Sequence, residues 1–505
     1  MRMETGKMRW AFSAMIAATA WLSGTAAAAA LTAPYALHGL DLNQDPIYLA
    51  RGAGDGLLVA GSRYDTQNTQ VQRFDSAGQS LGPAQWLAGR WNDIASDGTG
   101  NYVVATSGDQ GVWATLFNRN GGVAVPTFQV HTAAHLGVHA AMNEAGAFVL
   151  VYTRSVPDAN GTPIYTTLAR TFNRDGTSRS NAIQVAHGDN YANYGATGVS
   201  IDAAGNFSVV MIHVGGNKIQ IRVNRYNGTG LLLNSYDQVN DTGSANEAGV
   251  DGASLAGNAA GEHMVGWRAF DMPTGTAYVR AQRFGANGQK VGTPMLLDND
   301  PAGSVGNGRY QAKVGVADDG RFVAAWAART SALDANAPWG VFAREYAADG
   351  TPMGAVFRVD SAAESIPVNM YSVEVMMSPS GQYTVAWRSD RQMARRYNME
   401  GGPQVTELSN GVAVGGLSGA ANTFRYFRFS LAPNTPNFRL TMTGAGDADM
   451  VVRYGAPPTL SSYDFSTGVD GSNEVAQIGS PPAGDFYVGV FGYTSYSNVS
   501  LKADW

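Results

Sequence analysis

One repeated position of this chain carries an ionisable residue in four of its copies: Asp93, His139, Lys313 and Glu374. Each of them lies seven residues before a glycine of a recurring turn. Two carboxylates held roughly 6–9 Å apart suit general acid and base catalysis in an inverting hydrolase, which makes Asp93 and Glu374 the catalytic candidates. A ring of mixed charges also suits the binding of a polar ligand such as a glycan or a peptide, and all four residues are candidates for that role.

The neighbouring residues indicate how this position is presented. The other three copies hold Leu49, Gly198 and Ser254, whereas the following position is mostly apolar: Ile94, Val199, Leu255, Val314 and Val375. One side of these strands is therefore expected to pack, and the other to face the central channel of a ring of sheets. A channel lined by solvated charges, without any ligand, is the alternative interpretation, because a fold does not fix a function.

Other chemical signatures are missing or broken. The chain has no H-E-x-x-H motif, no G-x-x-x-x-G-K-[ST] loop and no G-x-S-x-G nucleophile elbow. Asp298 begins a segment like a calcium loop, but Ala302 and Arg309 break the pattern. The spacing of His131, His135 and His139 would suit metal on a helix, yet the repeats assign His131 and His139 to different sheets. We interpret them as loop and channel histidines.

The channel depends on an internal repeat that two patterns reveal. An aromatic residue followed four positions later by glycine recurs at Phe74/Gly78, Phe117/Gly121, Phe172/Gly176, Tyr226/Gly230, Phe284/Gly288, Tyr346/Gly350 and Tyr397/Gly401. Between these events, a turn glycine precedes a strand whose alternate residues are large and apolar, as in Phe322/Ala324/Trp326. These glycines are Gly56, Gly100, Gly146, Gly205, Gly261, Gly320 and Gly381. The unit resembles the G-x-[FY]-V-x-x-W … R-x-[FY]-x-x-x-G repeats of many secreted bacterial proteins.

Each repeat provides four short antiparallel strands, which is the blade of a β-propeller. The sequence therefore predicts an all-β fold with a seven-bladed propeller over residues 31–403. An open solenoid and stacked sandwiches are the alternatives. Residues 34–50 are expected to supply a strand that closes the ring against the last blade, and the first repeat, Leu58/Ala60/Ser62, is degenerate.

A different segment occupies residues 404–505. It contains Arg425-Tyr-Phe-Arg-Phe429, then Gly446-Asp-Ala-Asp-Met450-Val-Val-Arg453-Tyr-Gly455, then Asn473-Glu474, and it ends with Gly492-Tyr493 and Val499-Ser-Leu501. These motifs resemble the bacterial pre-peptidase C-terminal domain over nearly its whole length. The resemblance implies a jelly-roll-like β-sandwich of the kind appended to secreted proteases and other exported hydrolases. Some members bind calcium, and some hold insoluble substrate such as collagen.

Asp447 and Asp449 supply hard oxygen ligands of the type that calcium takes, and strand alternation would place both on one face. Turn capping, in which the carboxylates accept backbone N–H bonds, is the other interpretation. Many relatives carry a cysteine pair where this chain has Phe465 and Ala476, so that bridge is absent. No protease domain precedes the segment, so the resemblance implies no peptidase activity. No cofactor is required by any motif, and calcium is the one candidate.

Composition limits what the chain can do. Its 505 residues include no cysteine, which excludes thiol catalysis and zinc–thiolate sites, and its net charge is −6. No basic stripe is present, so we expect no nucleic-acid partner. Residues 1–30 are predicted to be a signal peptide, with basic residues before the apolar stretch Trp10–Leu22 and small residues up to Ala30. The stretch is too short to span a bilayer stably, although an N-terminal anchor is the alternative. A secreted protein, periplasmic or extracellular, without a transmembrane anchor follows.

Two functions from different classes fit these observations. The first is a secreted binding or adhesion protein, whose propeller takes an extracellular polymer, glycan or protein ligand while the C-terminal segment retains it on a substrate or surface. The second is an exported hydrolase or lyase that acts on an extracellular polymer through channel carboxylates. A structural envelope protein without a ligand is a third. The sequence leaves open whether the protein is an enzyme, and it favours binding because no catalytic motif is complete.

Overall fold

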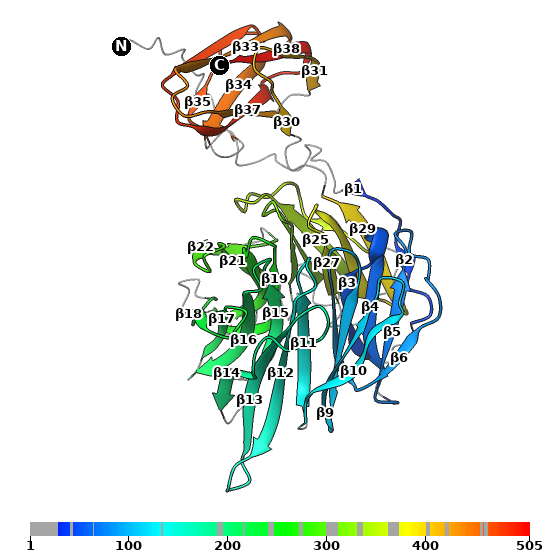
Figure 1. The fold of residues 1–505 in the computed structure, drawn as a ribbon. Helices are drawn as coiled ribbons and strands as arrows, with labels where there is room; N and C mark the ends of the chain where they lie inside the picture. Colours follow the sequence, from blue (N-terminus) through cyan, green and yellow to red (C-terminus); the bar gives the residue numbers. More distant parts are fainter. Residues whose placement is uncertain are drawn as a thin grey trace. The chain divides into compact units, whose positions relative to one another are not determined.

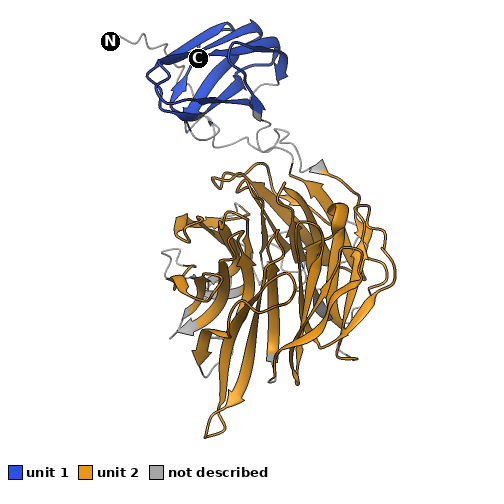
Figure 2. Ribbon diagram, viewed as in Figure 1, with its two compact units in different colours: residues 1–24, 401–505 blue, residues 25–400 orange. Residues whose placement is uncertain are grey.

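The computed structural model describes residues 29–40, 44–63, 65–132, 135–188, 195–215, 218–240, 247–271, 276–298, 312–330, 337–361, 373–399, 405–419, 424–454, 458 and 463–505. The chain forms two compact units, of which one lies within residues 25–400 and the other comprises residues 401–505 (Figure 2). The predicted signal peptide lies outside the described residues up to position 28, as does the calcium-like loop after Asp298. In the described ranges the regular structure is β-strand apart from one short 3-10 turn, η1 (Ala53–Asp55), so the predicted all-β class is confirmed.

The described part of the first unit contains seven antiparallel sheets, which we call blades 1 to 7 (Figure 1). Blades 1 to 3 each use four consecutive strands. Blade 1 contains β3 (Gln44–Arg51), β4 (Leu57–Arg63), β5 (Asn68–Phe74) and β6 (Gln85–Ala88). Blade 2 contains β7 (Trp91–Ser96), β8 (Tyr102–Gly108), β9 (Gly111–Phe117) and β10 (Val123–His131). Blade 3 contains β11 (His135–Met142), β12 (Phe148–Pro157), β13 (Pro163–Phe172) and β14 (Ile183–Gly188).

Blades 4 to 6 repeat this order, and blade 7 is different. Blade 4 contains β15 (Ala196–Ile201), β16 (Phe207–Gly215), β17 (Lys218–Tyr226) and β18 (Leu232–Tyr236). Blade 5 contains β19 (Glu247–Gly257), β20 (His263–Asp271), β21 (Thr276–Phe284) and β22 (Lys290–Leu296). Blade 6 contains β23 (Lys313–Val316), β24 (Phe322–Arg329), β25 (Trp339–Tyr346) and β26 (Phe357–Arg358). Blade 7 joins β27 (Val373–Met377), β28 (Gln382–Arg388) and β29 (Gln392–Asn398) to β1 (Ala29–Ala30) and β2 (Tyr35–Ala36) from the start of the described chain.

The first strands of the blades form a ring. Each contacts the first strand of the next blade, and β27 of blade 7 contacts β3 of blade 1. The last blade is completed by the N-terminal segment, because Tyr35 pairs with Ala394 and Ala36 with Met393. Within the expected range 34–50, β2 is the strand that pairs with the last blade, whereas β3 belongs to blade 1. The arrangement fits the predicted seven-bladed propeller.

The two sequence patterns meet as cross-strand partners. The aromatic residue two positions after the turn glycine of one pattern stacks on the aromatic residue four positions before the glycine of the other pattern. Tyr102 and Phe117 are such a pair, with ring centroids 4.8 Å apart. Equivalent stacked pairs are Phe148/Phe172, Phe207/Tyr226, His263/Phe284, Phe322/Tyr346 and Tyr383/Tyr397. Such pairs stabilise a sheet beyond the area they bury, by about 0.5–1.5 kcal/mol each. The repeats are therefore signatures of one cross-strand contact.

The first repeat departs from the pattern at its turn. The equivalent glycines of the later blades have φ values near +80 to +93°, which favour glycine, as at Gly146 (φ 87°). Gly56 instead has φ −71°, and two residues of η1, Gly54 (φ 60°) and Asp55 (φ 59°), have left-handed φ values. Gly56 still directly precedes β4, but a 3-10 turn replaces the tight turn, in keeping with the degenerate first repeat.

The second unit is a sandwich of two sheets. One sheet has the order β30-β32-β37-β34-β35 and the other the order β31-β38-β33-β36. Their strands are β30 (Val405–Glu407), β31 (Ala413–Gly419), β32 (Phe424–Leu431), β33 (Asn437–Ala445), β34 (Ala448–Tyr454), β35 (Phe465–Ser466), β36 (Glu474–Gly479), β37 (Gly484–Gly492) and β38 (Tyr496–Asp504). Ala476 is buried in the core between them and Phe465 packs against it, so apolar contacts fill the two positions where relatives place cysteines.

Candidate functional site

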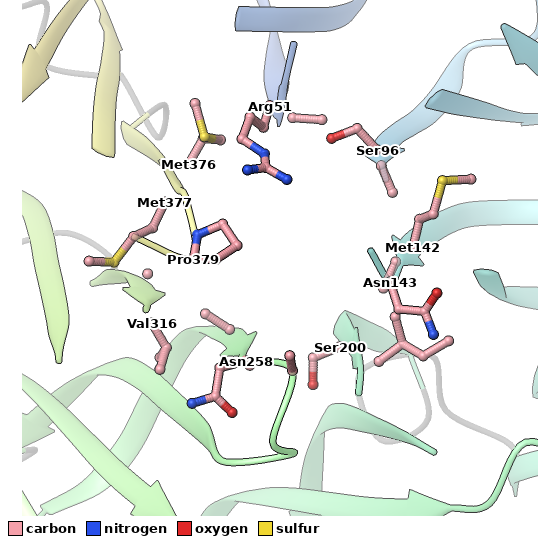
Figure 3. Close-up of a pocket in the computed structure, with 18 of the residues that line it drawn as sticks. Arg51, Ser96, Met142, Asn143, Ser200, Asn258, Val316, Met376, Met377 and Pro379 are labelled. Atoms are coloured by element: carbon pink, nitrogen blue, oxygen red, sulfur yellow. The ribbon is translucent and has the colours of Figure 1, made fainter. Parts of the chain in front are cut away.

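A cavity of about 280 Å³ opens at the ends of the seven first strands, and we call it the cup (Figure 3). All seven blades contribute to it and continue toward the turn that follows each first strand. Six blades begin at equivalent positions, Ile94, Ala140, Val199, Leu255, Val314 and Val375, and blade 1 begins one position earlier, at Leu49. Because equivalent positions of a repeat lie at equivalent heights, the cup is a ring of matching residues. Its volume is near the lower end of the usual range for small-molecule sites, about 300–1,000 Å³.

Hydrogen bonds between the turns of successive blades connect the rim of the cup. Backbone N–H groups of Gly98, Ala203 and Asp318 donate to carbonyls of the next blade at 3.3, 3.0 and 3.0 Å. The amides of Asn143 and Asn258 donate to Asp202 and Ala317 carbonyls, each at 3.1 Å, and so join blades 3 to 4 and 5 to 6. These bonds hold the rim in one geometry, which favours a preformed site.

The wall of the cup combines apolar side chains with polar atoms, and the polar atoms make up the larger share of its exposed lining. Met142, Ile201, Val316, Met376 and Met377 line it, and Figure 3 shows the labelled side chains arranged around the opening. Among the described residues that form the cavity, none is aromatic and only Arg51, Glu144 and Asp318 are ionisable. The expectation that the following positions merely pack is thus incomplete, because Ile94, Val199, Leu255, Val314 and Val375 also line the cup.

The four predicted channel residues form two ion pairs between neighbouring blades. Lys313 Nζ lies 2.8 Å from Glu374 Oε1, and His139 Nδ1 lies 3.7 Å from Asp93 Oδ2. Burial raises the pKa of Glu374, whereas Lys313 opposes that rise, and Asp93 and His139 also act on this carboxyl. The structure therefore places the four residues in two inter-blade ion pairs, with Asp93 and His139 near enough to act electrostatically on Glu374.

These four residues lie immediately beneath the cup. The cavity lining begins at Ile94, Ala140, Val314 and Val375, each of which directly follows one of the four residues. Asp93 makes two hydrogen bonds in addition to its contact with His139, because its carboxylate accepts the N–H groups of Ile94 at 2.7 Å and Ala140 at 3.0 Å. The side chains of the four are 14–21% exposed. Their roles as ligand or catalytic residues stay predictions.

Two members of the histidine triplet, His131 and His139, belong to different blades and have different partners, and the side chain of His135 lies outside the described residues. His131 ends β10 of blade 2 and its ring lies 5.5 Å from that of Tyr152 in blade 3. His139 faces Asp93, and its Nε2 lies 3.1 Å from the Ala196 carbonyl oxygen. Across the described ranges, no group of three histidine or acidic residues has the arrangement of a metal site.

In the second unit, Asp449 lies beside a carboxylate that sequence reasoning had not singled out for a role. Burial, followed by the charges of Glu474 and Asp447, raises the pKa of Asp449 to about 7. Glu474 accepts the N–H of Met450 at 2.9 Å and the hydroxyl of Thr467. Asp447 accepts the N–H of Gly471 at 2.9 Å, as turn capping requires. Asn473-Glu474 was visible in the motif, but nothing in the sequence placed it against Asp449.

Comparison with known proteins identifies the second unit. Residues 423–492 match the family of the bacterial pre-peptidase C-terminal domain, which confirms the resemblance. The chain is 35% identical over 113 residues to the alkaline serine exoprotease A of Vibrio alginolyticus, covering 21% of each chain. A solution structure titled vEP C-ter 100 is 29% identical and aligns over 20% of this chain and 99% of its own, with a TM-score of 0.18. The chain thus spans about a fifth of the first curated relative's length.

Solved structures of low identity align over a larger part of the chain. The polysaccharide lyase Uly1 is 9% identical and aligns over 72% of this chain and 92% of its own, with a TM-score of 0.39. No helix within the described ranges is long and apolar enough to cross a membrane.

Proposed function

We propose that this is an exported binding protein whose propeller takes a ligand in the cup, while the pre-peptidase C-terminal domain holds the protein on an extracellular polymer or surface. The observation that carries the proposal is the cup itself, a cavity built by all seven blades with a hydrogen-bonded rim. The retention role of the second unit is inferred from its family, whose members accompany exported hydrolases.

Binding is favoured over catalysis by the state of the two candidate carboxylates. Asp93 accepts two backbone N–H bonds, and Glu374 contacts Lys313 at 2.8 Å. A general acid and base must reach the reacting atoms, and both groups already have partners. The described residues that line the cup above them include no histidine, and its two carboxylates already have partners: Glu144 contacts Arg51, and Asp318 accepts the N–H of Ala259.

A hydrolase or lyase is the second candidate, and one observation favours it. Glu374 is an acid whose pKa is raised, chiefly by burial, and Asp93 acts on it electrostatically. Raised acids are typical of general acid catalysts. Turnover of a polysaccharide or protein polymer by the purified chain, lost in Glu374→Gln, would establish this function in place of binding alone.

The binding proposal is tested by filling the cup. Adhesion of the full chain to insoluble polysaccharides and insoluble proteins is measured first. In a second assay, the full chain is immobilised, and its capture of soluble ligands from the extracellular material of bacterial culture is measured. We expect Ser200→Trp, which places an indole in the cup, to lower capture at least tenfold. Ser200 lines the cavity, whereas Thr162 lies exposed at the tip of the β12–β13 hairpin.

Thr162→Trp is therefore the matched control, and it should retain full capture. Equal capture by Ser200→Trp and the wild type would overturn the cup as the binding site. Loss of adhesion to insoluble polymer in a chain truncated before residue 404, with capture by the cup retained, would separate the contributions of the two units.

A further inference from the structure

The cup contains one cationic group. Arg51 is the single basic residue among the described residues that line the cavity. Three other polar residues of the lining bond to the rim: the Asp318 carboxylate accepts the N–H of Ala259 at 3.1 Å, and Asn143 and Asn258 bond within and between turns. Ser96 and Ser200 add hydroxyl groups to the lining. In Figure 3 the guanidinium of Arg51 points into the opening.

Arg51 forms an ion pair with Glu144, whose partly exposed carboxylate can be displaced from the guanidinium. Its Nη2 lies 2.9 Å from both oxygens of Glu144, a residue of blade 3, whereas Arg51 ends β3 of blade 1. The Glu144 side chain is 49% exposed, against 21% for Arg51. The pair crosses above Gly98 of blade 2, where a Cβ atom would lie 2.0 Å from Glu144 Oε2. A half-exposed pair contributes little stability, about 0–1 kcal/mol, so its opening costs little.

The remaining cavity residues determine which uncharged group of a ligand can fit beside the part that Arg51 binds. The wall of the cup presents methionine and aliphatic side chains, and Met376 and Val316 lie beside the opening that Arg51 faces (Figure 3). Methionine adapts its shape to an apolar partner. No aromatic ring is present among the described cavity residues to stack on a sugar or a base. A cavity of about 280 Å³ admits one short apolar group with its charged end.

We propose that the cup binds an amphipathic carboxylate, a short apolar group that ends in one carboxylate. The ligand's carboxylate replaces that of Glu144 on Arg51, where the planar guanidinium can bind it through two N–H donors. The apolar part lies against the methionine and valine side chains. The terminal residue of a peptide and a short fatty acid share this chemistry. This ligand class rests on the proposed binding function and makes it specific.

Titration calorimetry of the full chain tests the class with four probes. Hexanoate and N-acetyl-leucyl-leucine carry the carboxylate, while hexanol and N-acetyl-leucyl-leucine amide lack it. We expect each acid to bind at least tenfold more tightly than its neutral partner, and the tighter of the two acids identifies the source. Arg51→Gln should remove this preference, and Glu144→Gln should strengthen acid binding several-fold because the competing carboxylate is gone.

Arg119→Gln, which removes an exposed arginine outside the cup, is the matched control and should bind as the wild type does. Equal binding of acids and neutral analogues, or acid binding that Arg51→Gln leaves unchanged, would overturn the assignment of Arg51 while leaving the cup as a binding site. Absence of binding by all four probes would overturn the ligand class. The capture assay with Ser200→Trp judges the binding function separately, so the two failures are distinguishable.

Discussion

Lys313 of blade 6 contacts Glu374 of blade 7, with Nζ and Oε1 2.8 Å apart, and the pair thereby joins two blades beneath the cup. Both side chains are mostly buried, at 21% and 14% exposure. Burial works against the charge of Glu374 and raises its pKa, and Lys313 counters that effect. The Lys313–Glu374 pair therefore contributes to the stability of the ring of blades, in addition to any role in ligand binding or catalysis.

Removing the cation alone should destabilise the propeller. In Lys313→Met the buried carboxylate of Glu374 loses its partner, and we expect the free energy of unfolding to fall by about 2–3 kcal/mol at neutral pH. The loss should shrink near pH 5, because a partnerless Glu374 takes up a proton. Urea unfolding at both pH values measures this.

Two further variants complete that experiment. The double variant Lys313→Met/Glu374→Gln should recover part of the loss, as a double-mutant cycle will show. Lys502→Met breaks the exposed pair with Asp504 on the second unit and should cost at most about 1 kcal/mol. A loss for Lys313→Met no larger than that for Lys502→Met would show that the channel pair is solvated.

The second unit should become less stable as pH rises. Burial and neighbouring carboxylates raise the pKa of Asp449 to about 7, so the folded unit favours its protonated form. Its contribution is complete below the unfolded pKa, near 4, and is lost as pH rises toward 7. We expect a fall of about 1–2 kcal/mol, discounted for partial exposure. Hydrogen exchange of β34 and β37 in the full chain measures it.

Asp449→Asn should flatten that dependence, whereas Asp504→Asn, at an exposed surface pair, should leave it in place. A wild-type profile that is flat between pH 4 and pH 7 would show that Asp449 ionises as an ordinary aspartate.

Calcium binding by the second unit should depend on pH, because it requires the ionised form of Asp449. Above pH 7, Asp447, Asp449 and Glu474 repel one another. As placed, the three do not form a metal site, so a divalent cation that relieves this repulsion would have to draw their carboxylates together. We expect millimolar calcium to raise the melting temperature of the second unit by a few degrees at about pH 8 and to have little effect at pH 5. Sodium chloride of equal ionic strength is the control. A transition that calcium and EDTA leave unmoved at both pH values would favour turn capping alone.

The N-terminal strand should be necessary for a closed ring. Tyr35 of β2 packs on Gly78 of blade 1, where a Cβ would lie 2.4 Å from the ring, and burial raises the pKa of Tyr35 to about 12. Tyr35→Ala removes this contact between blades 7 and 1 and should cost about 2–4 kcal/mol. Tyr493→Ala, at an exposed tyrosine of the second unit, is the control. Equal thermal stability of the two variants would contradict the role of this strand.

Export predicts a processed N-terminus near Leu31. Cleavage there would remove β1, while Thr32, whose hydroxyl accepts the N–H of Arg396 at 3.1 Å, and β2 would stay. Blade 7 would thus keep its outer strand. Mass spectrometry of the protein from culture supernatant and periplasm measures the mature end, and an uncleaved chain in the membrane fraction would contradict export.

The sequence was sufficient for the sheets because their signals are local. Tyr102 and Phe117, or Phe322 and Tyr346, occupy fixed distances from turn glycines, and those distances set the cross-strand register. The family motifs did the same for the second unit, where the family match confirms them. Blade 1 escaped the pattern because its 3-10 turn moves the left-handed glycine to Gly54.

The site was only partly predictable, because it depends on contacts between blades. Shared register predicted that Asp93, His139, Lys313 and Glu374 would converge, and the structure places them in two ion pairs between neighbouring blades. The sequence could not show which way each strand leans in the ring. The predicted ligand site was therefore placed on the four ionisable residues, whereas the cavity is lined by the residues that follow them. Arg51 and Glu144 meet across an intervening blade, and no periodicity relates two residues so placed.

The pairing of β2 with β29 also dictates an order of events during synthesis. Tyr35 leaves the ribosome early, yet its partner Ala394 follows more than 350 residues later. Until that partner arrives, the growing array has two open ends, each an unpaired sheet edge that invites aggregation. A contact of such long range is slow to form, since the chain between its ends must be ordered first. The finished ring is thus a late product, and the chain that precedes it is one that chaperones would have reason to hold.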